Sequence, residues 1–211
     1  MARPTSFQNV ITKIDGATGD VTVNPETTFT HANEEHLVCP GQNGGKNFPA
    51  GAYSPLNNAL FMPVQNLCAI MSPISDKIVP NNAYGLNVRP QLSPGADKVG
   101  TVYAVSVETG KTLWKFDNRA GVLSLAATGG GLVFGGDANG RFRALDQDTG
   151  KVLWEINLGA PVTGYPVTYA ANGKQYVAVS TGTSLVSVGV NRMAPELKPG
   201  TNNSIFVFAL P

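Results

Sequence analysis

Short runs of apolar residues, several alternating with polar ones, recur along this chain and are each bounded by Gly, Pro, Asn or Asp. A period of two between buried and exposed positions is typical of β-strands, and such bounding residues are typical of the turns between strands. No stretch of ten or more residues shows the spacing of an amphipathic helix. The pattern therefore predicts strands over residues 101–107, 131–136, 141–146, 151–156, 166–170, 175–181 and 204–210.

Two of the connections between these runs contain Asn-Gly, which is the strongest short signal for a β-hairpin. They lie in "DANG" (137–140) and "AANGK" (170–174). The runs on either side of each connection are therefore predicted to pair as antiparallel neighbours.

One short sequence motif occurs twice, 40 residues apart. "AVSVETGKTLWKF" (104–116) returns as "ALDQDTGKVLWEI" (144–156), and a third, degraded copy, "KIDGATGDVTV" (13–23), has Val23 where Trp is expected. Several strands per period of about 40–50 residues indicate a β-propeller with one four-stranded antiparallel blade per repeat. Trp114 and Trp154 are then predicted to dock one blade on the next. The alternative is an ordinary β-sandwich whose similar segments arise by chance.

At about 40–50 residues per blade, the 211 residues correspond to about four blades, with no separate second domain over 1–211. An open part of a ring leaves apolar sheet faces uncovered. We therefore expect the chain to associate, either with further blades or with a second copy of itself that completes the ring. A stable monomer is not expected.

Composition narrows the class of partner. The formal net charge is +1 and charged residues make up only 14% of the chain, so nothing marks it for nucleic acid or an anionic membrane surface. No apolar run approaches the roughly 20 residues that span a bilayer. The first residues lack the apolar core of a signal peptide. Either the protein is cytosolic or its targeting segment lies outside this chain.

The two cysteines, Cys39 and Cys68, stand 29 positions apart. Taken alone, they are either two buried, inert thiols or an oxidised pair, and a pair would imply an oxidising compartment. Two cysteines with no nearby histidine at ligand spacing do not make a structural zinc site.

Together with the Trp repeat, two segments resemble the C-terminal part of the quinoprotein alcohol dehydrogenases, which use pyrroloquinoline quinone (PQQ). These are "CPGQNGGKNFPAGAYSP" (39–55), followed by "NLC" (66–68), and the ending "NLGAPVTGYPVTYAANGKQYVAVSTG" (157–182). The resemblance covers essentially the whole chain and implies an all-β fold, part of an eight-bladed propeller.

The resemblance also implies roles for individual residues. Asn47 matches an asparagine whose side chain contacts PQQ, although an Asn in a Gly-rich loop is otherwise a turn residue. Val162 matches a position whose backbone approaches the cofactor, with a plain strand residue as the alternative. Cys39 and Cys68 match a disulfide. Trp114 and Trp154 are structural in the family too.

Two positions depart from the family pattern. Phe48 stands where many members have Trp, so the aromatic ring is kept but the indole donor is lost. Asn118, Arg119 and Ala120 stand where the family tends to carry an aromatic residue near the cofactor. These differences imply that the packing around the cofactor and the shape of the substrate pocket differ from the family pattern.

The family's catalytic aspartate, its metal ligands and the Trp stacked beneath PQQ belong to earlier blades, so no catalytic or metal-binding residue is predicted here. Asp137, Asp146 and Asp148 are predicted turn residues. His31 and His36 are expected at the surface or in a loop, and no CxxCH haem motif is present.

The resemblance thus implies a piece of an enzyme that oxidises alcohols to aldehydes or ketones, with PQQ and Ca²⁺ or a lanthanide as cofactors. Its implied partners are the alcohol, the remaining N-terminal blades, and cytochrome c or a similar electron acceptor. The implied location is the periplasm, and the chain alone is expected to be inactive. The alternative function is a non-catalytic propeller scaffold built from the same Trp-docking blades.

Overall fold

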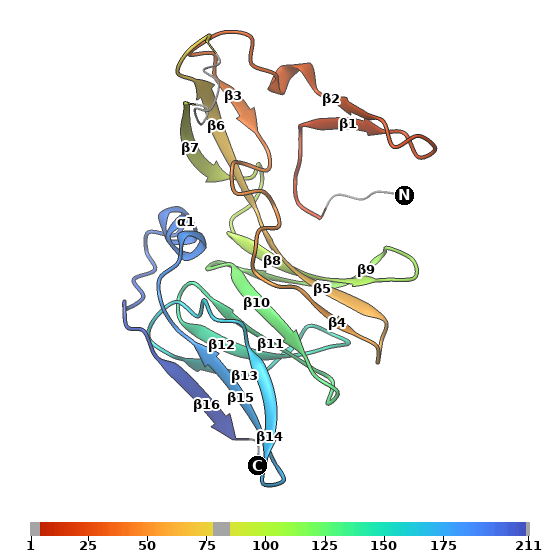
Figure 1. The fold of residues 1–211 in the computed structure, drawn as a ribbon, viewed down its shortest axis with the longest axis vertical. Coiled ribbons are helices and arrows are strands. Elements are labelled where there is room, and N and C mark those ends of the chain that lie inside the picture. Colours follow the sequence, from red (N-terminus) through yellow and green to blue (C-terminus); the bar gives the residue numbers. More distant parts are fainter. Residues whose placement is uncertain (1–4, 78–84, 210–211) are drawn as a thin grey trace. The chain divides into compact units, whose positions relative to one another are not determined.

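The described part of the chain, residues 5–77 and 85–209 of the computed structural model, divides into two units (Figure 1). Unit 1 contains the described residues up to 45 and those between 66 and 97. Unit 2 contains 46–65 and the described residues from 98 onward. Each unit is described by itself.

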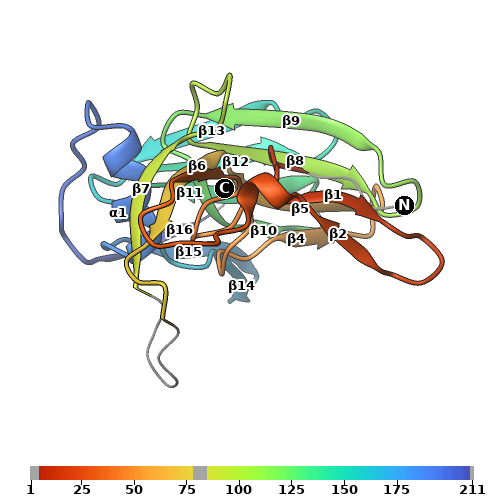
Figure 2. The ribbon, with the colours of Figure 1, turned by 90° about the horizontal axis from the view of Figure 1, so that it is seen from above.

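Unit 2 contains two four-stranded antiparallel sheets, each with the strand arrangement of a propeller blade. The first sheet has the order β4 (Ala52–Ser54), β5 (Ala59–Gln65), β8 (Gly100–Ser106) and β9 (Thr112–Asn118). The second has the order β10 (Val122–Ala127), β11 (Leu132–Asp137), β12 (Arg141–Asp146) and β13 (Val152–Asn157). Figure 2 shows β8 and β9 running side by side.

A third sheet completes unit 2 with three strands. It has the order β14 (Val167–Ala171), β15 (Lys174–Ser180) and β16 (Ile205–Ala209). The turn between β14 and β15 has positive φ at both Asn172 (51°) and Gly173 (76°), as the primed hairpin turns require.

Two apolar cores hold the three sheets of unit 2 together. Alternate residues of each strand point to opposite faces, so the second sheet contributes to both cores. Val133 packs with Phe61 and Val102 of the first sheet. Its neighbour Phe134 packs on the other side with Val177 of the third sheet. The sheets are therefore stacked like successive blades.

The repeat seen in the sequence is also a repeat of hydrogen bonds. In each copy the N–H of the first turn residue donates to the carbonyl oxygen of the residue five positions ahead. The carbonyl oxygen of the same residue accepts from the N–H of the glycine four positions ahead. The three turns begin at Asp15, Ser106 and Asp146. The glycines, Gly19, Gly110 and Gly150, have φ of 81°, 66° and 70°. The degraded copy therefore keeps the turn although it has lost the Trp.

Unit 1 contains a hairpin, a three-stranded sheet and a short 3₁₀ helix. The hairpin joins β1 (Ile11–Ile14) to β2 (Val21–Val23), and the sheet has the order β3 (His36–Val38), β6 (Leu67–Pro73) and β7 (Leu86–Leu92). The 3₁₀ helix spans Pro25–Thr27. β6 and β7 lie in the sequence between β5 and β8, so the first blade of unit 2 carries a long insertion.

The all-β propeller class predicted from the sequence is confirmed, and all seven predicted strands are present within about one residue at each end. Residue 210, the last of the predicted 204–210 strand, lies outside the described residues. The length of the chain predicted about four blades, and unit 2 contains three sheets. The length-based count included residues 66–97, which fold in unit 1. The prediction of one domain over 1–211 stays a prediction.

The expectation of almost no helix missed one element. Helix α1 (Leu185–Met193) lies between β15 and β16. It begins with a capping box, in which the side chains of Ser184 and Ser187 each accept from the other residue's backbone N–H. At nine residues the helix is shorter than the ten that the sequence scan required. Val190, which is 1% exposed, anchors it.

Candidate functional site

Asn47 lies in the segment 46–51, here called the Asn47 loop, which leads into β4. Its side-chain Oδ1 accepts the backbone N–H of Phe48 at 2.7 Å. The Lys46 ammonium bends over the loop and donates to the carbonyl oxygens of Asn47, at 2.7 Å, and of Pro49. Partial burial lowers the pKa of Lys46. The loop therefore has a conformation held by its own polar groups.

The Asn47 loop is fixed to the first strand of the second sheet. The N–H of Ala50 donates to the Ser124 hydroxyl at 3.2 Å, and the carbonyl oxygen of Ala50 accepts from the N–H of Leu125 at 2.9 Å. Both partners belong to β10, the edge strand of its sheet. Asn47 is thus placed near the edge of the second sheet that β10 forms.

Tyr165 connects the same loop to the ending segment of the resemblance. Its hydroxyl lies 3.5 Å from the carbonyl oxygen of Phe48, which is a long and weak contact. Both aromatic side chains are about half exposed, at 52% for Tyr165 and 54% for Phe48. The structure therefore brings the Asn47 loop and the "APVTGYP" segment together within unit 2.

Val162 belongs to that ending segment but faces the core. It is 1% exposed and packs in the core between the second and third sheets. Its N–H donates to the carbonyl oxygen of Asp137 at 3.0 Å. A Cβ on Gly136 would lie 2.3 Å from the Val162 side chain, so only glycine permits this approach. The side chain and N–H of Val162 are therefore already engaged within the protein.

Asp137 was predicted as a turn residue, and it is also the centre of a buried polar cluster. It is 1% exposed and forms an ion pair with Arg143 at 2.6 Å. It also accepts from the side-chain Nδ2 of Asn118 at 3.2 Å and from the backbone N–H groups of Asn139 and Arg141. A carboxylate bound in this way joins three segments of the blade stack. The sequence signalled only the hairpin, because nothing in it shows that Arg143 turns inward.

Residues 118–120, where the family tends to carry an aromatic residue, have structural partners of their own. Asn118 Oδ1 accepts the N–H of Ala120 at 2.8 Å, which closes the turn into β10. Arg119 donates to the Glu196 carboxylate at 2.7 Å and to the carbonyl oxygen of Met193 at the end of α1. The hydrogen bonds from Arg119 lower the pKa of Glu196. Polar contacts to α1 therefore lie where the aromatic ring was expected.

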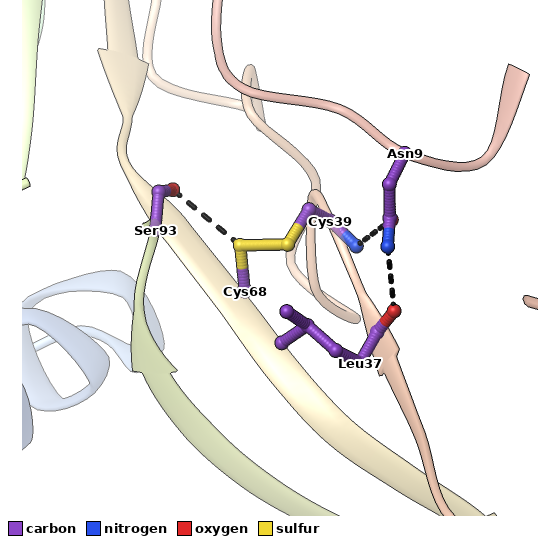
Figure 3. Close-up of a disulfide and its surroundings, with 5 residues drawn as sticks. All are labelled: Asn9, Leu37, Cys39, Cys68 and Ser93. Carbon is purple, nitrogen blue, oxygen red and sulfur yellow. Dashed lines mark hydrogen bonds between the residues drawn. A yellow bond between two sulfur atoms is a disulfide. The ribbon is translucent and has the colours of Figure 1, made fainter. Parts of the chain in front are cut away.

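Cys39 and Cys68 form a disulfide in unit 1, as the resemblance implied (Figure 3). Both are almost fully buried. Asn9 holds one side of the bridge, because its Oδ1 accepts the N–H of Cys39 and its Nδ2 donates to the carbonyl oxygen of Leu37. The Ser93 hydroxyl lies 3.5 Å from the Cys68 sulfur. The disulfide thus ties the residue that follows β3 to β6. Cys39 precedes the first residue of the Asn47 loop by seven positions in the sequence.

The two repeated tryptophans differ in their surroundings. Trp114 reaches from the first sheet to the turn of the second, where its indole N–H donates to the carbonyl oxygen of Gln147. Trp154 contacts the rings of Phe142 and Phe208, at centroid distances of 6.0 and 5.3 Å, but is 38% exposed. Trp114 therefore contacts the next blade at its Thr-Gly turn, and Trp154 contacts the third sheet through the ring of Phe208.

The remaining candidates have ordinary structural roles. His31 is exposed, and His36 lies in β3 with Nε2 3.0 Å from Glu34. Asp146 caps its turn through the N–H of Thr149, and Asp148 accepts from Asn57. Within residues 5–77 and 85–209 there is no group of three His, Cys, Asp or Glu that could hold a metal ion. The described helix is also too short to cross a membrane.

The sequence of this chain is similar to those of known dehydrogenases. The family described as "PQQ: Glucose/ethanol/alcohol dehydrogenase, beta-propeller domain" matches residues 118–177. The chain is 31% identical over 192 residues to the dehydrogenase subunit of the quinone alcohol dehydrogenase of Gluconacetobacter polyoxogenes, covering 83% of this chain and 26% of that protein. It is 31% identical over 186 residues to methanol dehydrogenase [cytochrome c] subunit 1 of Methylobacterium organophilum, covering 82% and 29%.

Among solved structures, a europium-containing methanol dehydrogenase superposes with a TM-score of 0.87 at 26% identity. That alignment covers 100% of this chain and 41% of the other. The chain thus spans between a quarter and a third of the length of these curated relatives. On the blade architecture, the Trp repeat, the disulfide and these similarities, the chain belongs to the family of PQQ-dependent (quinoprotein) alcohol dehydrogenases.

Proposed function

We propose that this chain is the C-terminal portion of a PQQ-dependent dehydrogenase that oxidises alcohols to aldehydes or ketones. In this proposal it supplies part of the propeller wall and some of the cofactor contacts. The relatives are three to four times longer, so the remaining blades would supply the other contacts. The chain by itself is then expected to be inactive.

The observation that carries the proposal is that two segments far apart in the sequence meet at the Asn47 loop, beside β10 of unit 2. The Asn47 loop is bonded to β10 through Ala50, and Tyr165 approaches it through Phe48. These are the two segments through which the chain resembles the family most specifically. Their meeting puts a fixed amide beside two partly exposed aromatic rings, which suits a planar, polar ligand.

The residues fit PQQ to different degrees. When bound, PQQ supplies the two-electron acceptor for alcohol oxidation. Asn47 fits a direct contact, because a carboxamide both donates and accepts hydrogen bonds and this one lies on an anchored loop. Val162 fits a supporting role, because its side chain is buried and its N–H is bonded to Asp137. It would hold the neighbouring backbone in place beneath the site.

The metal ion and the general base would come from the other blades. The described residues offer no cluster of metal ligands, and Asp137 is committed to Arg143. The europium of one relative favours Ca²⁺ or a lanthanide as the ion. The name of another, methanol dehydrogenase [cytochrome c], supports cytochrome c or a similar protein as electron acceptor.

The disulfide supports an oxidising compartment, because buried disulfides are rare in the reducing cytosol. We therefore propose that the parent protein is periplasmic.

The experiment that tests the cofactor contact is equilibrium dialysis of PQQ against the 211-residue chain combined with the remaining blades of the dehydrogenase. Asn47→Ala should raise the dissociation constant about tenfold, the value of one charge-assisted hydrogen bond. The control is Asn172→Gly, which changes another loop asparagine at a positive-φ position that glycine tolerates. No detectable PQQ binding, or equal binding by the Asn47 variant, would contradict the proposal.

A further inference from the structure

The Asn47 loop is anchored at its C-terminal end by contacts with two strands. Ala50 is bonded to β10 through both its N–H and its carbonyl oxygen. The next residue, Gly51, lies so close to β5 that an added Cβ would be 2.7 Å from the carbonyl oxygen of Phe61. Only glycine permits this approach. The backbone at Ala50 and Gly51 therefore has little freedom.

The N-terminal end of the same loop is held differently. The Phe48 side chain is 54% exposed, so apolar burial contributes little to fixing residues 46–48. Pro49 has no N–H to donate, so its carbonyl oxygen is the backbone group through which it can be bonded. The position of Asn47 within the loop therefore depends on polar contacts of the backbone.

Lys46 supplies two of these contacts from one ammonium group. It donates to the carbonyl oxygen of Asn47 at 2.7 Å and to that of Pro49. The two carbonyl groups flank Phe48 in the sequence, so one cation holds the backbone on both sides of that residue. Hydrogen bonds from a charged donor are about twice as strong as those between neutral groups.

The orientation of the Asn47 side chain depends on the peptide group that Lys46 binds. This peptide group joins Asn47 to Phe48, and it is planar. Its carbonyl oxygen accepts from the Lys46 ammonium, and its N–H, the Phe48 N–H, donates to Asn47 Oδ1 at 2.7 Å. A rotation of this plane would break both hydrogen bonds. The direction of the carboxamide is therefore coupled to the Lys46 contact.

We propose that Lys46 is a positioning residue, whose ammonium fixes the Asn47–Phe48 peptide group and thereby orients the Asn47 carboxamide for contact with PQQ. This inference rests on the function proposed above. Lys46 acts on the cofactor through Asn47 and does not itself contact PQQ.

Equilibrium dialysis of PQQ against the chain combined with the remaining blades of the dehydrogenase tests this role. Lys46→Met removes the charged donor and should weaken binding about fivefold, somewhat less than Asn47→Ala. Lys46→Arg keeps a charged donor and should recover most of the affinity. The matched control Lys174→Met, which removes an exposed charge at the start of β15, should bind like the wild type. Circular dichroism establishes that each variant is folded.

A double-mutant cycle separates positioning from direct contact. In the Asn47→Ala background, Lys46→Met should cause no further loss of affinity, because the two residues act as one unit. A further loss of about the same size as in the wild-type background would show that Lys46 acts on PQQ independently of Asn47. That result would overturn the positioning role.

Amide hydrogen exchange of the same assembly measures the loop in the absence of PQQ. The exchange rate of the Phe48 N–H reports how often its bond to the Asn47 carboxamide opens. Lys46→Met should increase this rate, and Lys46→Arg and Lys174→Met should not. The N–H of Leu125, which is bonded to Ala50 at the anchored end, is the internal control and should exchange at the wild-type rate.

The two readouts separate this inference from the proposed function. Unchanged PQQ affinity or unchanged Phe48 exchange in Lys46→Met would overturn the inference and leave the proposed function intact. An equal increase in exchange at Leu125 would also overturn it, because Lys46 would then support the whole loop rather than the Asn47 peptide group. Absence of PQQ binding by the wild-type assembly would contradict the proposed function, and Phe48 exchange would still decide whether Lys46 orients Asn47.

Discussion

The indole N–H of Trp114 donates a hydrogen bond to the backbone carbonyl oxygen of Gln147, with a nitrogen–oxygen distance of 2.8 Å. The same carbonyl oxygen accepts from the side-chain Nδ2 of Asn57 at 3.1 Å. Gln147 belongs to the Thr-Gly turn of the next blade, so two donors from one blade hold the turn of its neighbour. The repeated motif therefore attaches each of these blades to the next one.

Replacing Trp114 with Ala should destabilise the protein by about 3–5 kcal/mol, as for other large aromatic residues in cores. Trp154→Ala should cost less, because Trp154 is 38% exposed, whereas Trp114 also donates an indole hydrogen bond to the next blade. Urea unfolding of the two variants measures the difference. Equal losses would contradict the distinct roles of the two tryptophans.

The contact between Trp114 and Gly150 can be isolated by a matched pair of variants. A Cβ on Gly150 would lie 2.6 Å from the Trp114 ring, and one on Gly110 would meet nothing within 4 Å. Both glycines have positive φ in turns of the same construction. Gly110→Ala should therefore cost about 1–2 kcal/mol from backbone strain. Gly150→Ala should cost about 1–3 kcal/mol more through overpacking.

Thermal or urea unfolding measures both glycine variants. Equal losses of stability would show that Trp114 does not press on the turn.

The disulfide should stabilise unit 1 by limiting its unfolded states. It closes a loop with a sequence separation of 29 residues, for which chain entropy gives about 3–4 kcal/mol. Cys39→Ser combined with Cys68→Ser should lose about that amount in urea unfolding. Thiol titration of the unfolded, unreduced protein should find no free thiol. Two reactive thiols in protein matured in an oxidising compartment would contradict the bridge.

Glu34 should make unit 1 sensitive to acid. The N–H of Thr30, its hydroxyl and the N–H of His31 all donate to this carboxylate and lower its pKa to about 2. Because the folded pKa lies below the unfolded value of 4.5, the stabilisation is complete above about pH 5 and is lost as pH falls toward 2.

Melting temperatures between pH 2 and 7 test the Glu34 prediction. Glu34→Gln should melt lower than the wild type at neutral pH and should show a shallower loss of stability in acid. A variant with the same pH dependence as the wild type would exclude a role for this carboxylate.

The strands and the repeat were predictable because each depends on local pattern. Gly110 and Gly150 must take positive φ in the repeated turn, and Trp114 must face the next sheet, wherever the blades are placed. Helix α1 was missed because nine residues that include three valines give little helical signal. The insertion of β6 and β7 between β5 and β8 could not be assigned from local pattern, because sheet membership depends on distant partners.

The site was predictable only in part for the same reason. Asn47 could be found from its motif, but its anchoring by Ser124 and its proximity to Tyr165 depend on contacts between residues far apart in the chain. The Asp137–Arg143 ion pair was invisible because alternation does not show which charged residues turn inward.

The central claim is that this chain is one part of a quinoprotein dehydrogenase whose catalytic base and metal ligands lie in other blades. The most direct measurement is alcohol-dependent reduction of an artificial electron acceptor by the purified chain, supplied with PQQ and either Ca²⁺ or a lanthanide. The account predicts no turnover by the chain alone, and turnover when the remaining blades of the dehydrogenase are added. PQQ-dependent turnover by the chain alone would contradict it.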